Sequence, residues 1–578
     1  MDAELKVYPE CVELGSHSEV PIEKYGARAN AIVNLIKADL PIPKAWAFLC
    51  DSVHKFQNYE FPKFKGLNNS LNQGILVSLR ASPISREWGG PETLLNIGMN
   101  WRIHGMLKKA LGKAAVDALY FRFIQDFATQ VARLDAEDFD ILIDGSVNNN
   151  INYEKALKSA LILFEEETGN EFPQDPFDQL QQSLKSMASA WNSASARILR
   201  AARGAPVNAG LGLIVQEMVL GIGDGEFGSG IAQFVSPVTG EEKAYGRYLS
   251  QSQGRAAMKE EETAQYLARD KRGPSLEEIC PSCFSSLKSY ANIVTNLYRD
   301  DMQLEFTVKN GDVWLLDATP AHRTGRAAIA IVIRLQSMKL ITEEEALMRI
   351  APKILNEILH PQIDPKEKRV QIADGIGASP GAATGKIVFN ASSAVALASR
   401  GEASILVRIE TTPDDIRGMH SANGILTERG GINSHAAVVA RTLGLPCVVG
   451  VNNINIDQKN KKLHFENGTS LSEGDLITLD GSTGQILSGS TKLIEPELGG
   501  NFKQFMNWAD KTRTMGVRGN ADTPQDVRLA QKFGVDGIGL VRTEHMFFDT
   551  HRLNVMRELI FSEKTDDRQD ALNLLLPM

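Results

Sequence analysis

The segment from residue 424 to residue 441 constrains the fold more than any other part of the sequence. It begins with a short apolar run, Gly424-Ile425-Leu426-Thr427, continues through Gly430-Gly431, and then carries a helical pattern from Ser434 and His435 to Arg441. An apolar run, a glycine turn and a helical pattern in this order are typical of a strand that leads through a tight loop into a helix. The segment therefore predicts an α/β domain with His435 in the first turn of a helix.

The predicted position of His435 suits phosphoryl chemistry. Free backbone N–H groups and the positive end of the helix dipole stabilise an anion at a helix start. A neutral imidazole is nucleophilic near neutral pH, and an N-phosphoryl adduct divides one difficult transfer into two easier steps. Gly430 and Gly431 would let the backbone approach the phosphate closely. A polar histidine that merely begins a helix fits the same spacing, so the pattern alone leaves both interpretations open.

The remaining patterns divide the chain of 578 residues into about three or four domains. Residues 20–330 mix short apolar runs, such as 74–79, with helical stretches, such as 152–167, which indicates an α/β region. A helical region from 325 to 361 follows, with a capping box expected at Thr342–Glu345. It is expected to connect two domains.

The second half of the chain predicts two further blocks. The glycine- and alanine-rich stretch 375–385 is expected to form a turn that opens a compact α/β domain, with strands at 386–389 and 404–407 and an end near 487. After a polar connection, 515–518 and 537–541 read as buried strands that flank a helix at 524–533. This last block predicts the beginning of a β-α-β unit.

Composition excludes several classes of protein. The net charge of −9 argues against a nucleic-acid surface, which needs clustered Lys and Arg. No run approaches the ~20 apolar residues of a membrane span, and the N-terminal residues lack the order of a signal peptide, so we expect a cytoplasmic protein without a membrane role. Five cysteines in so long a chain do not predict a disulfide framework. Cys280 and Cys283 are expected to be incidental thiols, since no second pair completes a zinc site.

The central segment and its neighbours resemble a known family. Together with 409–416 and 446–450, it is similar to the phosphohistidine domain of the phosphoenolpyruvate-utilising enzymes, and specifically of the pyruvate phosphate dikinases. The resemblance implies a swivelling domain in which His435 carries phosphate from a nucleotide site to a distant pyruvate site. Asn433 stands where the family usually has threonine, and because plant members are regulated there, that control is expected to be absent.

The N-terminal part resembles the ATP-grasp nucleotide domain of the same family over residues 20–325. Residues 77–80 and 89–98 look like its phosphate-binding loop, residues 120–125 look like a segment that supplies a phosphate-contacting arginine, and residues 304–307 look like the strand that supplies a metal and nucleotide ligand. The resemblance implies that Arg80 and Arg122 bind nucleotide phosphates and that Glu305 holds Mg²⁺ and nucleotide. Arginine forks can neutralise and orient a phosphoryl group while a carboxylate holds Mg²⁺.

Several positions of this predicted ATP site depart from the family pattern. Arg28 replaces a lysine and keeps its charge, and Asp317 and Thr319 replace a glutamine and an arginine. Asp317 keeps the capacity to bind Mg²⁺, whereas Thr319 supplies no cation. The loop 233–237 lacks an expected Arg-Asp pair, and 253–256 replaces an acidic continuation. A divergent active site and a decayed site both fit these changes.

The C-terminal part resembles the start of the family's pyruvate-binding (β/α)₈ barrel. Residues 517–524 and 539–548 carry the resemblance, which implies that Arg518 and Arg542 bind the carboxylate or phosphate of the substrate. A complete barrel needs about 250 residues, so we expect about two of its eight strands here, with the rest lost or supplied by a separate chain. Cys447 is expected to be a small buried hydrophobe rather than the catalytic acid of that barrel.

These patterns together predict a multidomain α/β protein. The expected parts are an ATP-grasp nucleotide domain (1–325), a helical linker (326–374), a mobile phosphohistidine domain (375–490) and a truncated start of a barrel (510–578). The predicted function is a dikinase-type phosphotransfer in which ATP and phosphate phosphorylate His435 for relay to pyruvate, forming phosphoenolpyruvate, with the pyruvate half incomplete. The alternatives are a non-catalytic binding or regulatory protein with a degenerate ATP site, and a water-dikinase-like relative with another acceptor.

Overall fold

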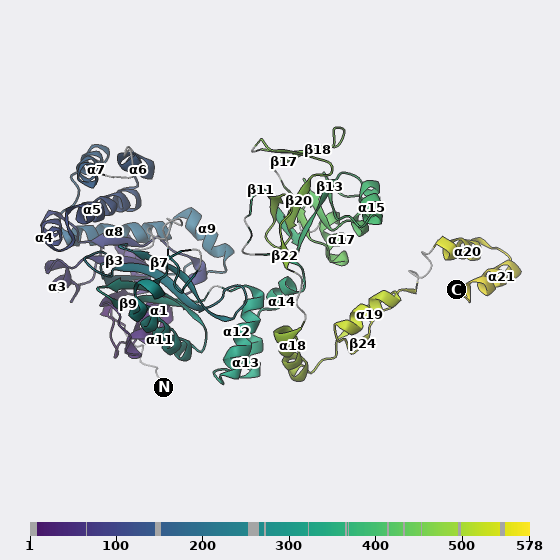
Figure 1. Cartoon of the computed structure of the whole chain (residues 1–578), viewed down its shortest axis with the longest axis horizontal. Coiled ribbons are helices and arrows are strands. Elements are labelled where there is room, and N and C mark those ends of the chain that lie inside the picture. Colours follow the sequence, from purple (N-terminus) through teal and green to yellow (C-terminus); the bar gives the residue numbers. More distant parts are fainter. Residues whose placement is uncertain are drawn as a thin grey trace. The chain divides into compact units, whose positions relative to one another are not determined.

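Two antiparallel sheets form the framework of the N-terminal region of the computed structural model (Figure 1). The structure describes residues 8–577 except 65, 145–151, 253–264, 271–272, 322, 365–366, 368, 413–414, 432–433, 452, 467, 495–498 and 544–549. The first sheet has the order β1-β2-β5-β3-β4, and its strands are β1 (Cys11–Glu13), β2 (Ala45–Phe48), β3 (Val77–Ser82), β4 (Leu94–Ile97) and β5 (Gly212–Glu217). The second has the order β7-β6-β8-β9, and its strands are β6 (Gly228–Val235), β7 (Glu242–Ser250), β8 (Met302–Lys309) and β9 (Asp312–Pro320).

Helix α1 (Ile22–Lys37) packs against strands of both sheets, namely β3 and β5 of the first and β9 of the second. This contact brings β8 and β9 of the second sheet next to β3. The close approach depends on Gly26, which has φ 82° and whose added Cβ would lie 1.6 Å from the carbonyl oxygen of Ser82. Only glycine fits at this crossing of helix and strand.

A group of helices covers the first sheet. Helices α5 and α8 pack on β4, and α8 also contacts β3. Edge-on pairs of aromatic rings, among Phe123, Phe127, Phe164 and Phe172, fill the core of this helical layer. The helices and short helical turns are α2 (Val53–Gln57), α3 (Leu67–Asn72), α4 (Trp101–Leu111), α5 (Lys113–Phe127), α6 (Ala136–Asp144), α7 (Tyr153–Thr168), α8 (Pro176–Trp191), α9 (Ala194–Ala202), η1 (Cys50–Ser52), η2 (Arg86–Trp88) and η3 (Ala128–Ala132).

The second sheet is covered by α11 (Pro281–Tyr298), which follows the short α10 (Leu276–Ile279). Cys280 and Cys283, at the start of α11, form a disulfide. The prediction of two incidental thiols is therefore wrong. Both sulfurs lie in the core beneath the sheet, where the first turn of the helix places residues three apart on one face.

Three helices connect this region to the next, namely α12 (Gly325–Ser337), α13 (Glu343–Met348) and α14 (Pro352–Ile358). The predicted capping box is confirmed at the start of α13. The Thr342 hydroxyl accepts the backbone N–H of Glu345, and the Glu345 carboxylate accepts the backbone N–H of Thr342.

The next region is built on one mixed sheet of eight strands in the order β11-β21-β20-β13-β14-β15-β16-β12. Strands β13 to β16 are parallel, and helices α15 and α17 pack on one face of them. The predicted turn at 375–385 is wrong, because its residues form β12 and β13, which pair with β16 and β20 far along the chain. The elements are β11 (Gln371–Asp374), β12 (Ile376–Ser379), β13 (Ala382–Val388), α15 (Ala391–Ser399), β14 (Ser404–Arg408), α16 (Ile416–Ser421), β15 (Gly424–Thr427), α17 (His435–Leu443), β16 (Cys447–Val449), β20 (Leu476–Asp480) and β21 (Gln485–Ser488).

Two smaller sheets complete this region. A three-stranded antiparallel sheet contains β17 (Ile454–Asp457), β18 (Lys462–Phe465) and β19 (Ser470–Ser472), and a short pair joins β10 (Gln362–Ile363) to β22 (Leu493–Ile494). Cys447 on β16 is fully buried, as predicted. Within the described residues, no helix has both the length and the apolar character needed to cross a membrane.

Chain contacts separate residues 502–578 from residues 1–501. Strands β23 (Arg518–Gly519) and β24 (Gly537–Ile538) pair in parallel around α19 (Pro524–Lys532), which confirms the predicted β-α-β start. The prediction that these strands are buried is wrong, because Val517 and Leu540 beside them are about half exposed, at 52% and 51%. The other helices of this part are α18 (Gly500–Thr512), α20 (Thr550–Phe561) and α21 (Thr565–Leu575).

Candidate active site

The first candidate site lies at the start of α17, where His435 is the first helical residue. The Ser434 side chain caps the helix by accepting the backbone N–H of Ala437, and the Ser434 backbone N–H donates to the carbonyl of Gly431 at 2.9 Å. The buried face of the helix, including Ala436 and Ala440, packs on the sheet, so the small side chains hold the helix start close to β15 and β16. The predicted place of His435 at a helix start is confirmed.

The glycine turn before His435 needs Gly430 in particular. Gly430 has φ 117°, and an added Cβ would lie 3.0 Å from the Cβ of Ser434. Gly431 has no such requirement, since an added Cβ would meet no atom within 4 Å. Asn433, whose identity was expected to remove a regulatory site, lies outside the described residues.

A hydrogen bond fixes the imidazole of His435, which is half-buried. The hydroxyl oxygen of Thr411 lies 3.0 Å from Nδ1 of His435. The loop that carries Thr411 is held in turn by Asp415, whose Oδ2 accepts the backbone N–H of Thr412 at 2.9 Å and Nε of Arg408 at 3.3 Å. With Nδ1 engaged, Nε2 is the nitrogen left for chemistry.

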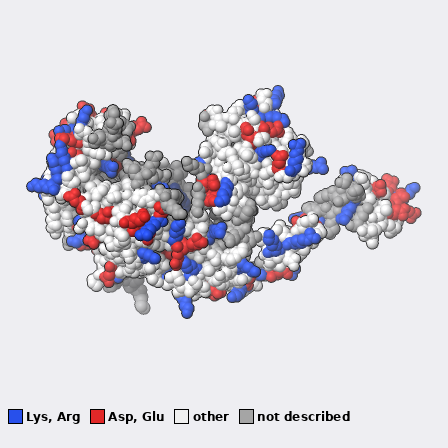
Figure 2. Space-filling model, viewed as in Figure 1, with Lys and Arg blue, Asp and Glu red and all other residues white. Residues whose placement is uncertain are grey.

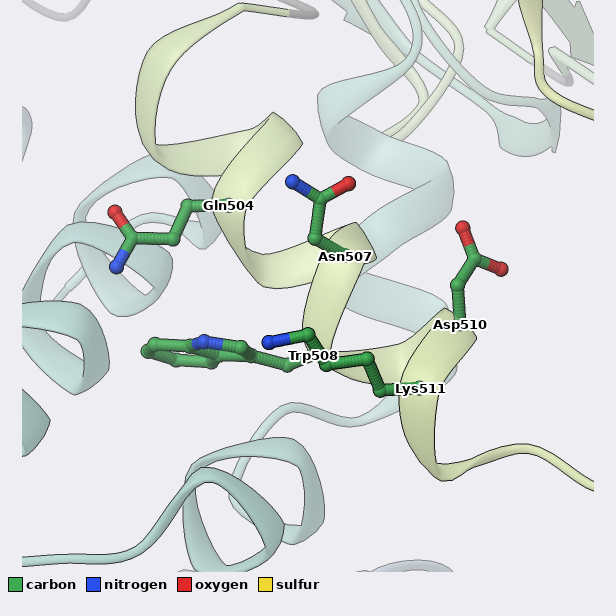
Figure 3. A pocket seen from close by; sticks show the side chains of 5 residues that line it. All are labelled: Gln504, Asn507, Trp508, Asp510 and Lys511. Carbon is green, nitrogen blue, oxygen red and sulfur yellow. The ribbon is translucent and has the colours of Figure 1, made fainter.

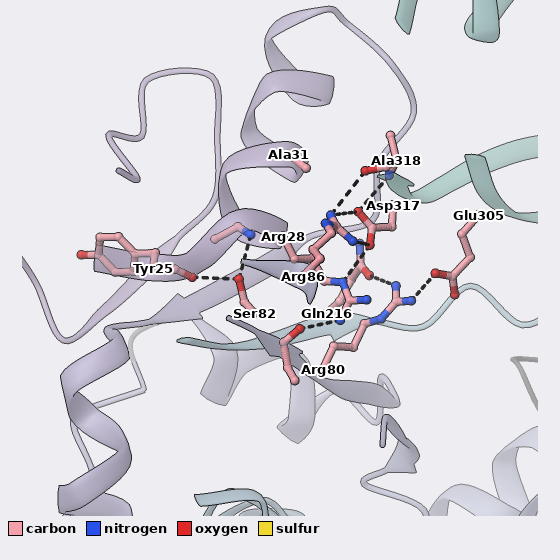
Figure 4. A network of polar contacts seen from close by, with 12 residues as sticks. Tyr25, Arg28, Ala31, Arg80, Ser82, Arg86, Gln216, Glu305, Asp317 and Ala318 are labelled. Carbon is pink, nitrogen blue, oxygen red and sulfur yellow. Dashed lines mark hydrogen bonds and ion pairs between the residues drawn. The ribbon is translucent and has the colours of Figure 1, made fainter. Parts of the chain in front are cut away.

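A second candidate site lies where α1, β3, β8 and β9 meet. Glu305 on β8 and Asp317 on β9 are paired neighbours in the sheet register. Three arginines reach these two carboxylates from other elements, and Figure 4 shows the resulting network. The arginines are Arg28 on α1, Arg80 on β3 and Arg86 on η2.

Asp317 is the centre of this network. Its carboxylate accepts Nε of Arg28 at 2.8 Å and both Nη1 and Nη2 of Arg86 at 2.8 Å, although only 1% of its side chain is exposed. Burial by itself would raise the pKa of Asp317, but the positive charges of Arg28 and Arg86 outweigh it and hold the pKa well below its usual range. Asp317 is therefore ionised and fully paired.

Arg80 and Glu305 form the other half of the network. Arg80 Nη2 pairs with Glu305 Oε2, and Arg80 Nη1 donates to Oε1 of Gln216 at 3.4 Å. Burial disfavours the charged form of Arg80, yet Glu305 and Asp317 outweigh it and raise the pKa of Arg80. Glu305 is the more accessible carboxylate, with 26% of its side chain exposed.

The structure does not bring all the predicted site residues together. Arg122 lies on α5, and it makes no hydrogen bond or ion pair with the described residues of the cluster. Arg518, on β23, donates to the carbonyl of Ile538 at 3.4 Å. Arg542 follows β24 and pairs with Asp522 at 3.4 Å. Gln253–Ala256, where an acidic continuation was expected, fall outside the described part of the chain.

Three residues of these sites were missed from the sequence. Arg86 and Gln216 join the arginine cluster, and Thr411 contacts His435. Arg86 carried a usable signal, because it lies between Arg80 and Gly89-Gly90 in the predicted phosphate loop. Thr411 lies in the stretch 409–416 that carried the family resemblance, although no role was predicted for it, and Gln216 carried no signal.

Metal-binding capacity at the arginine cluster rests on its two carboxylates. Among the described residues, no group of three or more His, Cys, Asp and Glu side chains could hold a metal ion. Mg²⁺ is commonly bound by one or two carboxylates together with substrate phosphates, so Glu305 fits that role. Asp317 does not fit it, because Arg28 and Arg86 occupy both of its oxygens.

The charges on one face of the described residues and one pocket lie apart from both candidate sites. On the face shown in Figure 2, basic and acidic side chains are interspersed. Figure 3 shows a pocket of about 460 Å³ whose five lining residues, among them Trp508 and Lys511, all come from α18. None of the predicted site residues lines it.

Comparison with known proteins relates this chain to one group of enzymes. Residues 401–484 match the family model described as PEP-utilising enzyme, mobile domain, and residues 496–571 match the one described as PEP-utilising enzyme, PEP-binding domain. The chain is 37% identical to a pyruvate, phosphate dikinase of Rhizobium meliloti, with 96% of this chain and 66% of the relative covered. It is 38% identical to that of Clostridium symbiosum, with 87% and 58% covered.

A plant relative of the same name shows a similar level of identity. The chain is 36% identical to the chloroplastic pyruvate, phosphate dikinase 1 of Arabidopsis thaliana, with 87% of this chain and 53% of the relative covered. The chain therefore spans less than two thirds of the length of these curated relatives.

Proposed function

The chain belongs to the pyruvate, phosphate dikinase family, and on that basis we propose that it transfers phosphoryl groups through His435. ATP and phosphate would phosphorylate His435, and the phosphoryl group would then pass to pyruvate to form phosphoenolpyruvate. The observation that carries this proposal is the 3.0 Å contact between Thr411 Oγ1 and His435 Nδ1 at a helix start.

The contact selects the reactive nitrogen. When Nδ1–H donates to the Thr411 hydroxyl oxygen, the proton resides on Nδ1 and the lone pair of Nε2 is available. Nε2 then attacks phosphorus, an N–P bond forms, and the bond from phosphorus to the leaving oxygen breaks. Backbone N–H groups at the start of α17 are placed to stabilise the transferred anion.

We assign residues 1–325 to an ATP-grasp nucleotide domain. Arg28 and Arg80 would bind nucleotide phosphates, and Arg122 would join them from α5. Glu305 would hold Mg²⁺, which would supply positive charge to neutralise the phosphates. The predicted metal role of Asp317 is not kept, because a carboxylate that already accepts three N–H groups from two arginines has no oxygen left for a cation.

The other assignments follow the predicted boundaries. Residues 326–374 are a helical linker, residues 375–490 are the mobile phosphohistidine domain, and residues 510–578 are the start of the pyruvate-binding barrel. The two family matches, at 401–484 and 496–571, support the last two assignments. Arg518, the first residue of β23, and Arg542, which follows β24, would bind the substrate there. The comparisons give no support to a separate chain that supplies the rest of the barrel.

One observation favours a second candidate, a binding or regulatory protein that keeps the fold without turnover. Both carboxylates of the cluster are paired with arginines, so the arginines are partly neutralised before any phosphate arrives. Such a protein would bind nucleotide weakly or not at all and would leave His435 unmodified.

Labelling separates the two functions. The protein is incubated with ATP radiolabelled in its phosphates, unlabelled phosphate and Mg²⁺, and the label bound to protein is measured after acid and after alkali, beside a His435→Ala control. Phosphotransfer predicts a label that acid removes and alkali spares, and that is absent from the control. If the wild-type protein takes up no label, phosphotransfer is excluded and the binding or regulatory function remains.

A further inference from the structure

Arg86 belongs to the charged cluster, but no sequence motif predicted its role there. It lies on η2, between β3 and the glycine pair Gly89-Gly90, and 26% of its side chain is exposed. Its guanidinium grips both oxygens of Asp317 at 2.8 Å, and Nη2 also donates to the carbonyl oxygen of Ala318 at 3.3 Å (Figure 4). A bidentate pair of this kind fixes both the position and the plane of a guanidinium group.

The cluster holds more positive than negative charge. Three guanidinium groups, those of Arg28, Arg80 and Arg86, face the two carboxylates of Glu305 and Asp317. Burial and the neighbouring charge of Arg80 lower the pKa of Arg28, which is the response expected of a cation in a positive field. An anion is the ligand that would relieve this excess.

The same place holds polar atoms without partners. The side chains of Arg80 and Gln216 are at least nine-tenths buried. Nε of Arg80 and Nε2 of Gln216 nevertheless make no hydrogen bond among the described residues. Buried N–H groups without acceptors are costly, and native sites that contain them commonly receive a ligand or water. Two idle donors beside an excess of positive charge suit the oxygens of a phosphate group.

We propose that Arg86 is a phosphate-binding residue of the nucleotide site and that Asp317 is the positioning residue that holds its guanidinium in place. This inference rests on the proposed function, since it concerns the same ATP site. In this proposal Asp317 does not bind a metal ion but positions the guanidinium groups of Arg28 and Arg86.

Arg86 keeps donors for this role after its bonds to the protein are counted. A guanidinium carries five N–H groups, and Arg86 commits one on Nη1 and two on Nη2. The N–H of Nε and the second N–H of Nη1 are left for a ligand.

A purely structural role is the competing explanation. In that case Arg86 would only fasten its loop to β9, and its loss would reduce stability and affect every ligand alike. Affinity for ATP relative to adenosine separates the two roles, since adenosine has the base and sugar but no phosphate.

The test compares Arg86→Ala, Arg86→Lys and the matched control Arg203→Ala in the full chain, by calorimetric titration with ATP and Mg²⁺ and with adenosine. Arg203 is exposed and contacts the same loop, at the carbonyl oxygen of Glu87, without reaching Asp317. Its replacement therefore removes a charge of the same sign beside the same loop. A thermal unfolding curve of each variant reports on folding.

The proposal predicts that Arg86→Ala weakens ATP binding by about 10- to 100-fold, leaves adenosine binding unchanged, and that Arg86→Lys recovers part of the loss. Arg203→Ala should behave as wild type. Asp317→Asn should reduce ATP affinity less in the Arg86→Ala background than in the wild-type protein, because Asp317 acts partly through Arg86.

If Arg86→Ala loses affinity for ATP and adenosine equally and unfolds at a lower temperature, or loses affinity for neither, Arg86 does not bind phosphate. The proposed function stands in both cases as long as the wild-type protein binds ATP. A wild-type protein that binds no ATP would overturn both.

Discussion

The hydroxyl oxygen of Thr411 lies 3.0 Å from Nδ1 of His435, so this hydrogen bond engages Nδ1 and leaves Nε2 outside it. The two residues come from different elements, since Thr411 lies in the loop after β14 and His435 begins α17. The parallel pairing of β14 with β15 brings the loop and the helix start to the same edge of the sheet. The topology of the sheet therefore places the Thr411 hydroxyl group beside the His435 ring.

Replacing Thr411 by valine should slow phosphorylation of His435. Valine keeps the shape but removes the oxygen, so the proton is no longer held on Nδ1, and the rate should fall by about fivefold to tenfold, equivalent to one hydrogen bond of about 1 kcal/mol. Thr411→Ser keeps the hydroxyl and should retain most of the rate. Nitrogen NMR of the His435 ring reports the tautomer directly, and an unchanged tautomer and rate in Thr411→Val would contradict the assignment.

The glycine turn before His435 offers a matched pair of substitutions. Gly430→Ala forces a side chain into a left-handed conformation and against Ser434, which should cost about 1–3 kcal/mol in the free energy of unfolding. Gly431→Ala meets no neighbouring atom and should change stability little. Denaturant unfolding of both variants checks this, and equal stabilities for the two would show that the turn does not require Gly430.

The ion pairs of Asp317 should make part of the stability depend on pH. Because its pKa is depressed in the folded protein, its contribution is complete above the ordinary carboxyl pKa of about 4 and is lost as the pH falls through the lower folded value. Asp317→Asn should cost about 3 kcal/mol near pH 7, since it leaves buried arginines without their counter-ion.

The free energy of unfolding, measured for both proteins from pH 7 downward, tests this linkage. The gap between wild type and variant should narrow below about pH 4. A gap that stays constant over this range would mean that the ionised carboxylate does not contribute.

Cys447 should be inert to alkylating reagents in the folded protein. Burial raises the pKa of its thiol to about 12, so at pH 8 only on the order of one molecule in ten thousand carries the reactive thiolate. Iodoacetamide treatment followed by peptide mass analysis should find Cys447 unmodified until denaturant is added. Rapid modification in the native protein would contradict its assignment as a buried apolar side chain.

Local patterns predicted the features that depend on neighbours in the sequence. The start of α17 at His435 and the capping box of α13 both follow from residues within one helical turn, and both are confirmed. Strand β12 and the first residues of β13 were mistaken for a turn because glycine and alanine are poor strand formers, and they form strands through pairing with β16 and β20.

The arginine cluster was only partly predictable for the same reason. Arg86 and Asp317 are separated by 231 positions in the sequence, so no local signal joins them. The family resemblance supplied Arg28, Arg80 and Glu305 but could not indicate that Asp317 would be paired with two arginines. That pairing arises from the packing of α1 against both sheets.

Whether His435 carries a phosphoryl group can be measured directly as the mass of the intact protein after incubation with ATP, phosphate and Mg²⁺. Fragmentation of the protein then locates the modification. The account predicts a gain of roughly 80 Da, one phosphoryl group, on His435 that is lost in acid and does not form in His435→Ala. An unchanged mass, or a gain that remains in His435→Ala, would contradict it.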